Sequence, residues 1–318
     1  MSEKDNFQFG CNPLKTIMPM RLKPLSEKLR AFLKIVGVFL ILTGIWTLYR
    51  LWSVNLIICD GEMNLTMFFL TQIVFQPLLA LLPILFIVRY VEKRRIGSIG
   101  LSRQRFVRNA FFGVFLSLFN SIAFACLAYV LFVPLGAGPI TFTMNPENLG
   151  LISIFLMPLT FLFVVGPSEE IETRGYFQTR LLEHFGPRFS IVFCSMLFAL
   201  AHVPIDILIW RYDVWMMFFH LLGVFISGSV MGYLYYLSGV LTGPIFLHAF
   251  LDIQSLAYGF SFDYERLSPE VRFGIEGLIW AVVTVLTFLL IRFLTSKLGL
   301  KIENLPWEKH KNPIEKKQ

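Results

Sequence analysis

The feature that most constrains the fold of this chain is a series of long apolar runs separated by short polar segments. A helix needs roughly 20 apolar residues to cross the hydrocarbon core of a bilayer. Eight runs are near or above this length: 32–53, 66–90, 108–133, 149–167, 189–210, 214–237, 240–258 and 273–295. The sequence therefore predicts an all-α, polytopic transmembrane helix bundle with about eight membrane-spanning helices.

The overall composition agrees with this interpretation. Of 318 residues, 56% are hydrophobic and 15% are charged, whereas a soluble domain has about 25% charged residues. A soluble fold of this length cannot bury so much apolar surface. A membrane protein can, because lipid is the solvent for the outer faces of its helices.

Lysine and arginine are distributed unevenly between the polar segments. They are frequent in the amino-terminal tail, in the segment 89–108 and after Lys297, and they are absent from the segment 134–150. Since cytoplasmic loops carry an excess of these residues, we expect a cell-membrane protein with an even number of spans and both termini in the cytoplasm. The net charge of +7 reflects this asymmetry, so we expect the lipid bilayer as a partner and no nucleic acid.

These features predict one domain with two tails. Residues 1–31 form a basic cytoplasmic tail, residues 32–295 form a single transmembrane domain, and residues 296–318 form a lysine-rich cytoplasmic tail.

Ionisable groups at membrane depth need an explanation, because each costs roughly 2.5–3.5 kcal/mol even on the lenient insertion scale. The first group lies in GPSEEIETRGYFQ, residues 166–178. We expect Gly166-Pro167 to kink or restart the helix, which would place Glu169 and Glu170 in a first turn that favours carboxylates. Glu170 and Arg174 are four residues apart and can form an ion pair. The carboxylate of Glu169 is then not used in that ion pair and can accept a proton from water. Alternatively, this is a juxtamembrane segment whose charges are hydrated.

Two further motifs bring histidines to membrane depth. In FALAH (198–202), Phe198 and His202 share a helix face, and in HAFLD (248–252) so do His248 and Asp252. Taken singly, each motif could be a polar contact that only joins two helices.

Taken together, the motifs predict a reactive site. Polar groups in a membrane bundle turn inward, so Glu169, His202, His248 and Asp252 should converge on a polar cavity that holds water. A carboxylate and imidazoles can activate water for attack on a carbonyl. Glu and two His could instead coordinate zinc.

The ordered trio SEEIETRG, FALAH and HAFLD resembles the motifs of the CAAX prenyl protease type II and bacteriocin-processing (Abi, or CPBP) family of intramembrane endopeptidases. The resemblance covers about residues 149–258, the motif core of the predicted protease domain. It implies a helical membrane fold, typically of eight spans, with the site inside the bundle and open towards the cytoplasm. It also implies a protein or peptide substrate, which in this family can be lipid-modified.

Roles follow from the resemblance by position. It implies that Glu169 is the base that activates water, that His202 assists it, and that His248 and Asp252 stabilise the oxyanion. The family has been described both as metal-free glutamate peptidases and as metalloproteases, so a zinc ion held by Glu169, His202 and His248 is an alternative. The resemblance further implies structural supports of the site at Glu170 and Arg174.

Two positions depart from the family pattern. Asp252 stands where the family often has Asn, and an ionised Asp would repel an oxyanion. Asp252 must therefore be protonated, orient His248 or favour a metal. Glu172 stands where the family usually has an apolar residue; it could share the face of Glu169, but we expect it to face headgroup water.

Three functions remain in competition at this point. The leading hypothesis is an endopeptidase that cleaves a peptide bond near the cytoplasmic membrane surface. The second is a catalytically silent scaffold, such as an immunity or regulatory protein, on the same fold, which missing motif residues would favour. The third is a proton-coupled transporter, which inverted repeats and paired broken helices would favour.

Overall fold

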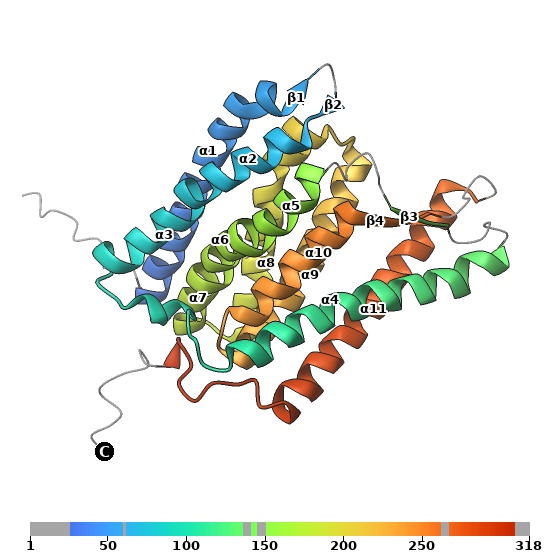
Figure 1. Cartoon of the computed structure of the whole chain (residues 1–318). Helices are drawn as coiled ribbons and strands as arrows, with labels where there is room; N and C mark the ends of the chain where they lie inside the picture. The colour runs from blue at the N-terminus through green and yellow to red at the C-terminus, as the bar shows by residue number, and fades with distance from the viewer. Residues whose placement is uncertain (1–25, 60–61, 136–140, 145–150, 262–266, 309–318) are drawn as a thin grey trace, which may run out of the picture.

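The structure is a computed structural model that describes residues 26–59, 62–135, 141–144, 151–261 and 267–308 (Figure 1). Most of the basic amino-terminal tail, most of the segment 134–150 and the end of the carboxy-terminal tail lie outside these residues. The predicted sidedness and tail boundaries therefore stay predictions.

Each predicted apolar run coincides with a long helical segment. Several of these segments contain π-helical turns (η1, η2, η6, η7 and η8), and η3 and η4 are short 3-10 helices. The helical elements are α1 (Glu27–Ile57), α2 (Leu65–Gln76), η1 (Pro77–Leu81), α3 (Leu82–Phe86), η2 (Ile87–Val91), η3 (Ile96–Ile99), α4 (Phe106–Phe132), η4 (Val133–Leu135), α5 (Leu151–Thr160), η6 (Phe161–Val165), α6 (Gly166–Glu170), η7 (Ile171–Gln178), α7 (Thr179–His184), α8 (Pro187–Ile205), η8 (Asp206–Trp210), α9 (Val214–Ser238), α10 (Thr242–Ala257) and α11 (Pro269–Lys297). Two short antiparallel ladders join helix ends, β1 (Ile58–Cys59) with β2 (Glu62–Met63) and β3 (Thr141–Met144) with β4 (Tyr258–Ser261).

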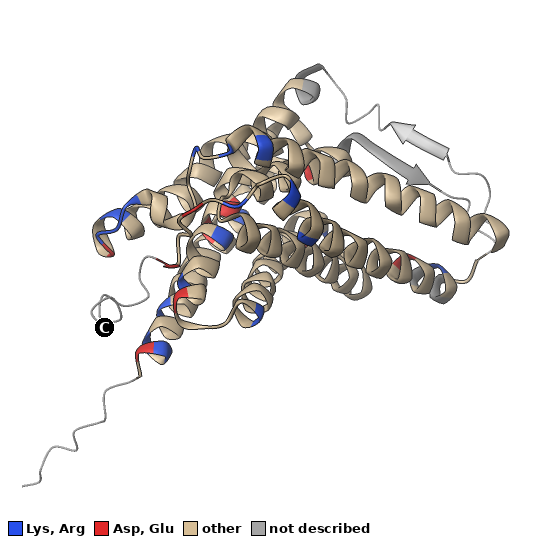
Figure 2. Ribbon diagram, turned by 90° about the horizontal axis from the view of Figure 1, so that it is seen from below, with Lys and Arg blue, Asp and Glu red and all other residues tan. Residues whose placement is uncertain are grey.

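Six helices of the described part are long and apolar enough to cross a membrane. Large apolar side chains on their outer faces are exposed, such as Leu40 at 62% and Phe111 at 72%, as expected where lipid is the solvent. Figure 2 shows how sparse charged residues are along the long helices. The predicted class, a polytopic helical membrane bundle, is confirmed. The six spans are Glu27–Ile57, Leu65–Val91, Phe106–Leu135, Pro187–Trp210, Val214–Ser238 and Gly274–Lys297.

The other two predicted runs, 149–167 and 240–258, correspond to α5–η6 and α10, which position the first and third motifs. Helix α10 packs against α4, α9 and η6. A Cβ atom on Gly113 of α4 would overlap the carbonyl oxygen of Gly243, so the backbones of α4 and α10 are in direct contact. This close approach holds α10 in the interior of the bundle.

Of the two alternatives expected at Gly166-Pro167, a kink or a restart of the helix, the restart does not occur. Gly166 is helical (φ −53°, ψ −51°), and the chain remains helical from α5 to α7. Pro167 has no N–H to donate, and the helix accommodates it with π turns on both sides, η6 and η7. Glu169 lies in the first turn of α6 and Glu170 at its end, but α6 continues directly from η6, so neither carboxylate lies at a free helix amino terminus.

Helix α9 contains small residues at which neighbouring side chains approach its backbone closely, in one half of the helix only. Its carbonyl oxygens at Gly228 and Gly232 accept hydrogen bonds from Arg174 (3.1 Å) and Gln178 (2.8 Å). A Cβ on Gly232 would lie 2.7 Å from Oε1 of Gln178, whereas a Cβ on Gly223 would meet no atom within 4 Å. Only the carboxy-terminal half of α9 is therefore packed closely against η7.

Candidate active site

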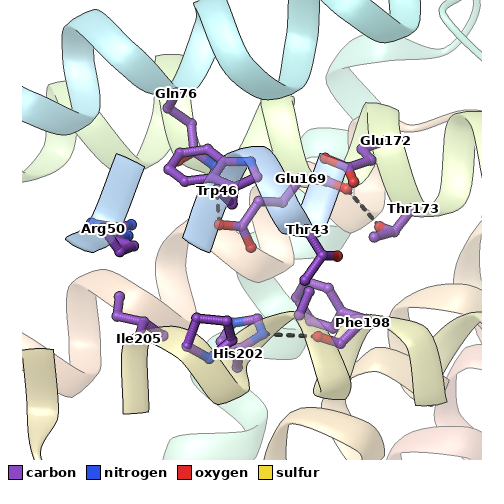
Figure 3. Close-up of a pocket in the computed structure, with 12 residues that line it drawn as sticks. Thr43, Trp46, Arg50, Gln76, Glu169, Glu172, Thr173, Phe198, His202 and Ile205 are labelled. Carbon is purple, nitrogen blue, oxygen red and sulfur yellow. Dashed lines mark hydrogen bonds between the residues drawn. The ribbon is translucent and has the colours of Figure 1, made fainter. Parts of the chain in front are cut away.

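The three motifs lie side by side although they are far apart in the sequence. Helix α10 packs against α6, and α8 packs against η7. Residues of α1, α2, α6, η7 and α8 line a pocket of about 100 Å³ (Figure 3), whereas His248 and Asp252 of α10 are not part of its lining. The pocket is lined by Thr43, Trp46, Arg50, Gln76, Glu169, Glu172, Thr173, Phe198, Ala201, His202, Pro204 and Ile205.

Glu169 projects into this pocket. Its Oε1 accepts a hydrogen bond from Nε2 of Gln76 (3.2 Å), and its Oε2 lies 3.7 Å from Nε2 of His248. The side chain is 24% exposed. One oxygen of the carboxylate is therefore hydrogen-bonded, and the carboxylate remains accessible to water from the pocket.

Glu170, in contrast, is fully buried and tied to protein groups. Its Oε1 accepts a hydrogen bond from Nη1 of Arg174 over 2.6 Å, so the predicted ion pair is present. Arg174 also donates to Thr173 and to the carbonyl of Gly228, and its guanidinium lies 4.4 Å from the centre of the Phe198 ring. Arg174 thereby links the first motif to α8 and α9.

His248 connects Glu170 to the other carboxylates of the site. Its Nδ1 lies 2.9 Å from Oε1 of Glu170. Because a carboxylate oxygen can only accept, Nδ1 is the donor. Nε2 lies 3.4 Å from Oδ2 of Asp252 and 3.7 Å from Oε2 of Glu169. The structure thus brings Glu169, His248 and Asp252 together around one ring nitrogen.

His202 faces the same pocket from α8. Its Nδ1 lies 2.9 Å from the carbonyl oxygen of Phe198, and a carbonyl oxygen only accepts. Nδ1 therefore carries the hydrogen, and the lone pair is on Nε2. The Phe198 ring makes edge-on contacts with both imidazoles, with centroid distances of 4.8 Å to His202 and 5.7 Å to His248. Within the described residues, His202 makes no direct polar contact with Glu169 or His248.

The predicted zinc ligands are not assembled as a ligand set. Among the residues that the structure describes, no group of three His, Cys, Asp or Glu side chains is arranged to hold a metal ion. The hydrogen bonds of the histidines do not decide this, because Nδ1 of each ring donates to a protein oxygen and leaves Nε2 free, as in histidines that bind zinc; the arrangement of the three side chains does. The donors as placed do not fit a zinc ion, so we derive no reaction step through a metal.

Glu172 lies on the wall of the pocket, within electrostatic range of Glu169. The expectation that it faces headgroup water is therefore wrong. Asp206 and His220, which lie outside the three motifs, form a pair at 2.9 Å. The imidazole ring of His220 lies 6.0 Å from that of His202.

Sequence reasoning missed a polar chain that reaches Glu169 from the first two helices. With the amide oxygen of Gln72 directed at Arg50, that oxygen accepts from Nη1 (3.0 Å) and Nη2 (2.7 Å), and the amide nitrogen donates to Gln76 (2.9 Å). Gln76 in turn donates to Glu169. The signal was an arginine inside the apolar run 32–53 and two glutamines, four residues apart, inside the run 66–90.

Comparison with known families gives one match, and it covers the three motifs. Residues 151–254 match the family model described as Type II CAAX prenyl endopeptidase Rce1-like. No curated protein and no solved structure matches the chain. The resemblance predicted from the motifs is confirmed over residues 151–254, the part of this multi-pass membrane protein that matches the Rce1-like family of membrane proteases.

Proposed function

We propose that the chain is an intramembrane endopeptidase that hydrolyses a peptide bond near the cytoplasmic membrane face, with water activated by Glu169. The observation that carries this proposal is that the adjacent glutamates Glu169 and Glu170 have different environments. Glu170 is buried and bonded to Arg174 and His248, whereas Glu169 is exposed to a pocket that it shares with His202.

The first step is attack by water on the carbonyl carbon of the substrate. Glu169 accepts one proton of the water, and Nε2 of His202, which has the free lone pair, accepts a hydrogen bond from the same water. General base catalysis by a positioned group contributes about 10²- to 10⁴-fold to such a step. Gln76 holds the other oxygen of Glu169 and so keeps the base directed at the water.

The second step is stabilisation of the tetrahedral oxyanion. Nδ1–H of His248 donates to Glu170, so a second proton on Nε2 makes the ring an imidazolium, and this Nε2–H is a donor for the oxyanion. Collapse of the intermediate then breaks the carbon–nitrogen bond, and Glu169 returns its proton to the leaving amine.

Asp252 has a supporting part in this scheme. Its Oδ2 lies 3.4 Å from Nε2 of His248, which favours the alternative in which Asp252 orients that ring and shares its proton. The carboxylate of Asp252 then accepts a hydrogen bond from Nε2–H of His248 until the oxyanion forms and takes its place as acceptor.

The substrate class is inferred from the family description, which reads Type II CAAX prenyl endopeptidase. We propose a lipid-modified protein or peptide tail, because such a substrate lies at the membrane surface with its peptide bond close to the bundle. The substrate's lipid then locates it in the bilayer.

The test uses the full chain in proteoliposomes with a farnesylated, internally quenched peptide. Wild type should cleave it, and Glu169→Gln should lower kcat/KM by about 10²- to 10⁴-fold at an unchanged Tm. Glu303→Gln, at an exposed position after α11, is the matched control and should resemble wild type. Normal cleavage by Glu169→Gln would refute the assignment of the base. Lack of cleavage by the wild type on lipid-modified and unmodified peptides alike would favour the silent scaffold.

A further inference from the structure

A groove on the outer side of the bundle combines an apolar wall with basic side chains at one end. It lies between α4 and α11, which pack against each other (Figure 1), and has a volume of about 710 Å³. Ligand sites in proteins have volumes of roughly 300–1,000 Å³. This α4–α11 groove lies outside residues 151–254, and the catalytic scheme does not use it.

The wall of the α4–α11 groove is apolar and open to the surroundings of the bundle. Phe111 is 72% exposed and Phe115 is 45% exposed, and both belong to the apolar span Phe106–Leu135. Leu294 lines the opposite side of the groove from the span Gly274–Lys297. Because lipid is the solvent for such faces, the ligand that this wall favours is an acyl chain.

Two basic side chains lie at one end of the groove, at the depth of the lipid headgroups. Arg108 is the third residue of the span Phe106–Leu135, and Lys297 is the last residue of the span Gly274–Lys297. Long basic side chains at the ends of spans extend their charges to the membrane surface. No Asp or Glu lines the groove, and within the described part of the chain neither cation pairs with a carboxylate. This end of the groove is therefore positively charged.

A third cation adds to the positive charge. A Cβ atom on Gly299 would lie 3.7 Å from Nη1 of Arg108 and 3.8 Å from Nη1 of Arg105, so the two guanidinium groups lie close together. Arg105 donates to the carbonyl oxygens of Gly299 and Lys301, which orients its charge without neutralising it. The positive end of the helix dipole of α4, which begins at Phe106, lies there as well. Since like charges repel, an anion at this position would be stabilised.

An anionic phospholipid has both parts that the groove requires, an acyl chain and a phosphate. Arginine binds phosphate with parallel N–H···O bonds, and basic pockets between membrane helices are a common kind of headgroup site. We propose that the α4–α11 groove binds one anionic phospholipid, with the phosphate at Arg108 and Lys297 and an acyl chain along Phe111 and Leu294. The basic segments at this end are those predicted to be cytoplasmic, and the cytoplasmic leaflet carries anionic lipid. This inference does not depend on the proposed protease activity.

The first experiment measures lipid binding by native mass spectrometry of the full chain in detergent. The chain is titrated with dioleoyl phosphatidylglycerol or with dioleoyl phosphatidylcholine, and the readout is the ratio of the two Kd values. Wild type should prefer phosphatidylglycerol by about 30-fold, from about fivefold for each of two basic side chains. Arg108→Gln/Lys297→Gln should lower this preference by about tenfold or more.

The matched control is Lys28→Gln/Arg30→Gln, which removes the same charge from exposed positions at the start of α1. It should keep the wild-type preference. If both double variants lose the preference equally, the lipid responds to the charge of the whole membrane face, and the groove is not a specific site. Equal binding of the two lipids to wild type would also overturn the proposal.

Competition distinguishes the lipid from other occupants of the groove. Glycerol 3-phosphate has the charge but no acyl chain, and the farnesylated probe peptide has an apolar chain but no phosphate. Neither, at the concentration of the lipid, should displace phosphatidylglycerol from wild type. Displacement by glycerol 3-phosphate would indicate a site for free phosphate esters, and displacement by the peptide would indicate a site for the substrate. Either result would overturn the proposal.

Photocrosslinking tests the position of the bound lipid. Phosphatidylglycerol with a diazirine in one acyl chain should crosslink to the two segments that line the groove, 107–115 and 294–300. Arg108→Gln/Lys297→Gln should lose these crosslinks, and Lys28→Gln/Arg30→Gln should keep them. Crosslinks that are spread evenly over the lipid-facing helices in wild type would overturn the proposal.

Discussion

Nδ1 of His248 donates to Oε1 of Glu170 over 2.9 Å, and the same oxygen accepts a hydrogen bond from Arg174. This shared oxygen fixes the imidazole so that its other nitrogen is directed at Glu169 and Asp252. The rigid part of the site is thus a buried triad from α6, η7 and α10, and the reactive part is built on it.

Loss of Arg174 should destabilise the protein as well as inactivate it. In Arg174→Ala, the buried carboxylate of Glu170 loses its ion-pair partner, which costs roughly 3–5 kcal/mol in comparable buried pairs. Thermal unfolding in detergent should show a clear drop in Tm. The double variant Arg174→Ala/Glu170→Ala should lose less than the sum of the two single changes, and exposed Arg188→Ala should match wild type. A wild-type Tm for Arg174→Ala would contradict the buried-triad interpretation.

Asp252 should tolerate Asn better than Ala. The side-chain oxygen of Asn at this position can still accept from Nε2 of His248, and its NH₂ group can donate to an oxyanion. We expect Asp252→Asn to keep kcat/KM within about tenfold of wild type, and Asp252→Ala to lose about 10²-fold or more. The check is the ratio between the two variants at equal Tm. If both lose activity to the same extent, the carboxylate itself is required.

Zinc should not be bound at stoichiometric levels. In the part of the chain that the structure describes, no three His, Cys, Asp or Glu side chains are arranged to hold a metal ion. We expect detergent-purified protein to contain little zinc and to remain active in chelator. The control is His202→Ala/His248→Ala, whose metal content should equal that of wild type. Near-stoichiometric zinc that disappears in this variant would establish a metal site instead.

Gly113 should not tolerate a side chain. A Cβ there would overlap the carbonyl oxygen of Gly243 and lie 2.9 Å from the backbone nitrogen of Leu247, so Gly113→Ala would force α4 away from α10. We expect a loss of about 1–3 kcal/mol, which is typical of overpacking, seen as a lower Tm. The matched control is Gly44→Ala on α1, which has no atom within 4 Å of the added Cβ and should be neutral or stabilising by up to about 1 kcal/mol. Equal Tm values for both variants would contradict the close contact between α4 and α10.

Glu92 should make stability depend on pH. Burial raises the pKa of its carboxyl, but ion pairs with Arg180 (2.7 Å) and Lys34 (2.6 Å) outweigh it, so the pKa lies below its ordinary value of 4.5. The ionised Glu92 therefore stabilises the fold above pH 4.5, and this contribution is lost as the pH falls through the folded-state pKa.

We expect Glu92→Gln to lower Tm at pH 7 and to reduce the fall in Tm between pH 7 and pH 4. Exposed Glu303→Gln is the control and should follow the wild-type curve. A Glu92→Gln curve parallel to that of wild type would show that Glu92 makes no such contribution.

The sequence by itself determined the helical class, the segments that become helices and the local pairs within them. The apolar runs fix the helices because only helices satisfy backbone groups in lipid. The spacing of four residues fixes the pair of Glu170 with Arg174, since the geometry of a helix places these side chains on one face. The motif trio also predicted the family whose model matches residues 151–254.

The tertiary structure decided which of these groups meet across helices. The contact of His248 with Glu170, and the chain from Arg50 through Gln72 and Gln76 to Glu169, join residues from separate helices. Such contacts depend on how each helix is rotated and packed about its axis, and spacing within one helix carries no information about that. The same is true of Pro167, since two π turns kept helical a segment in which the sequence predicted a kink or a restart of the helix.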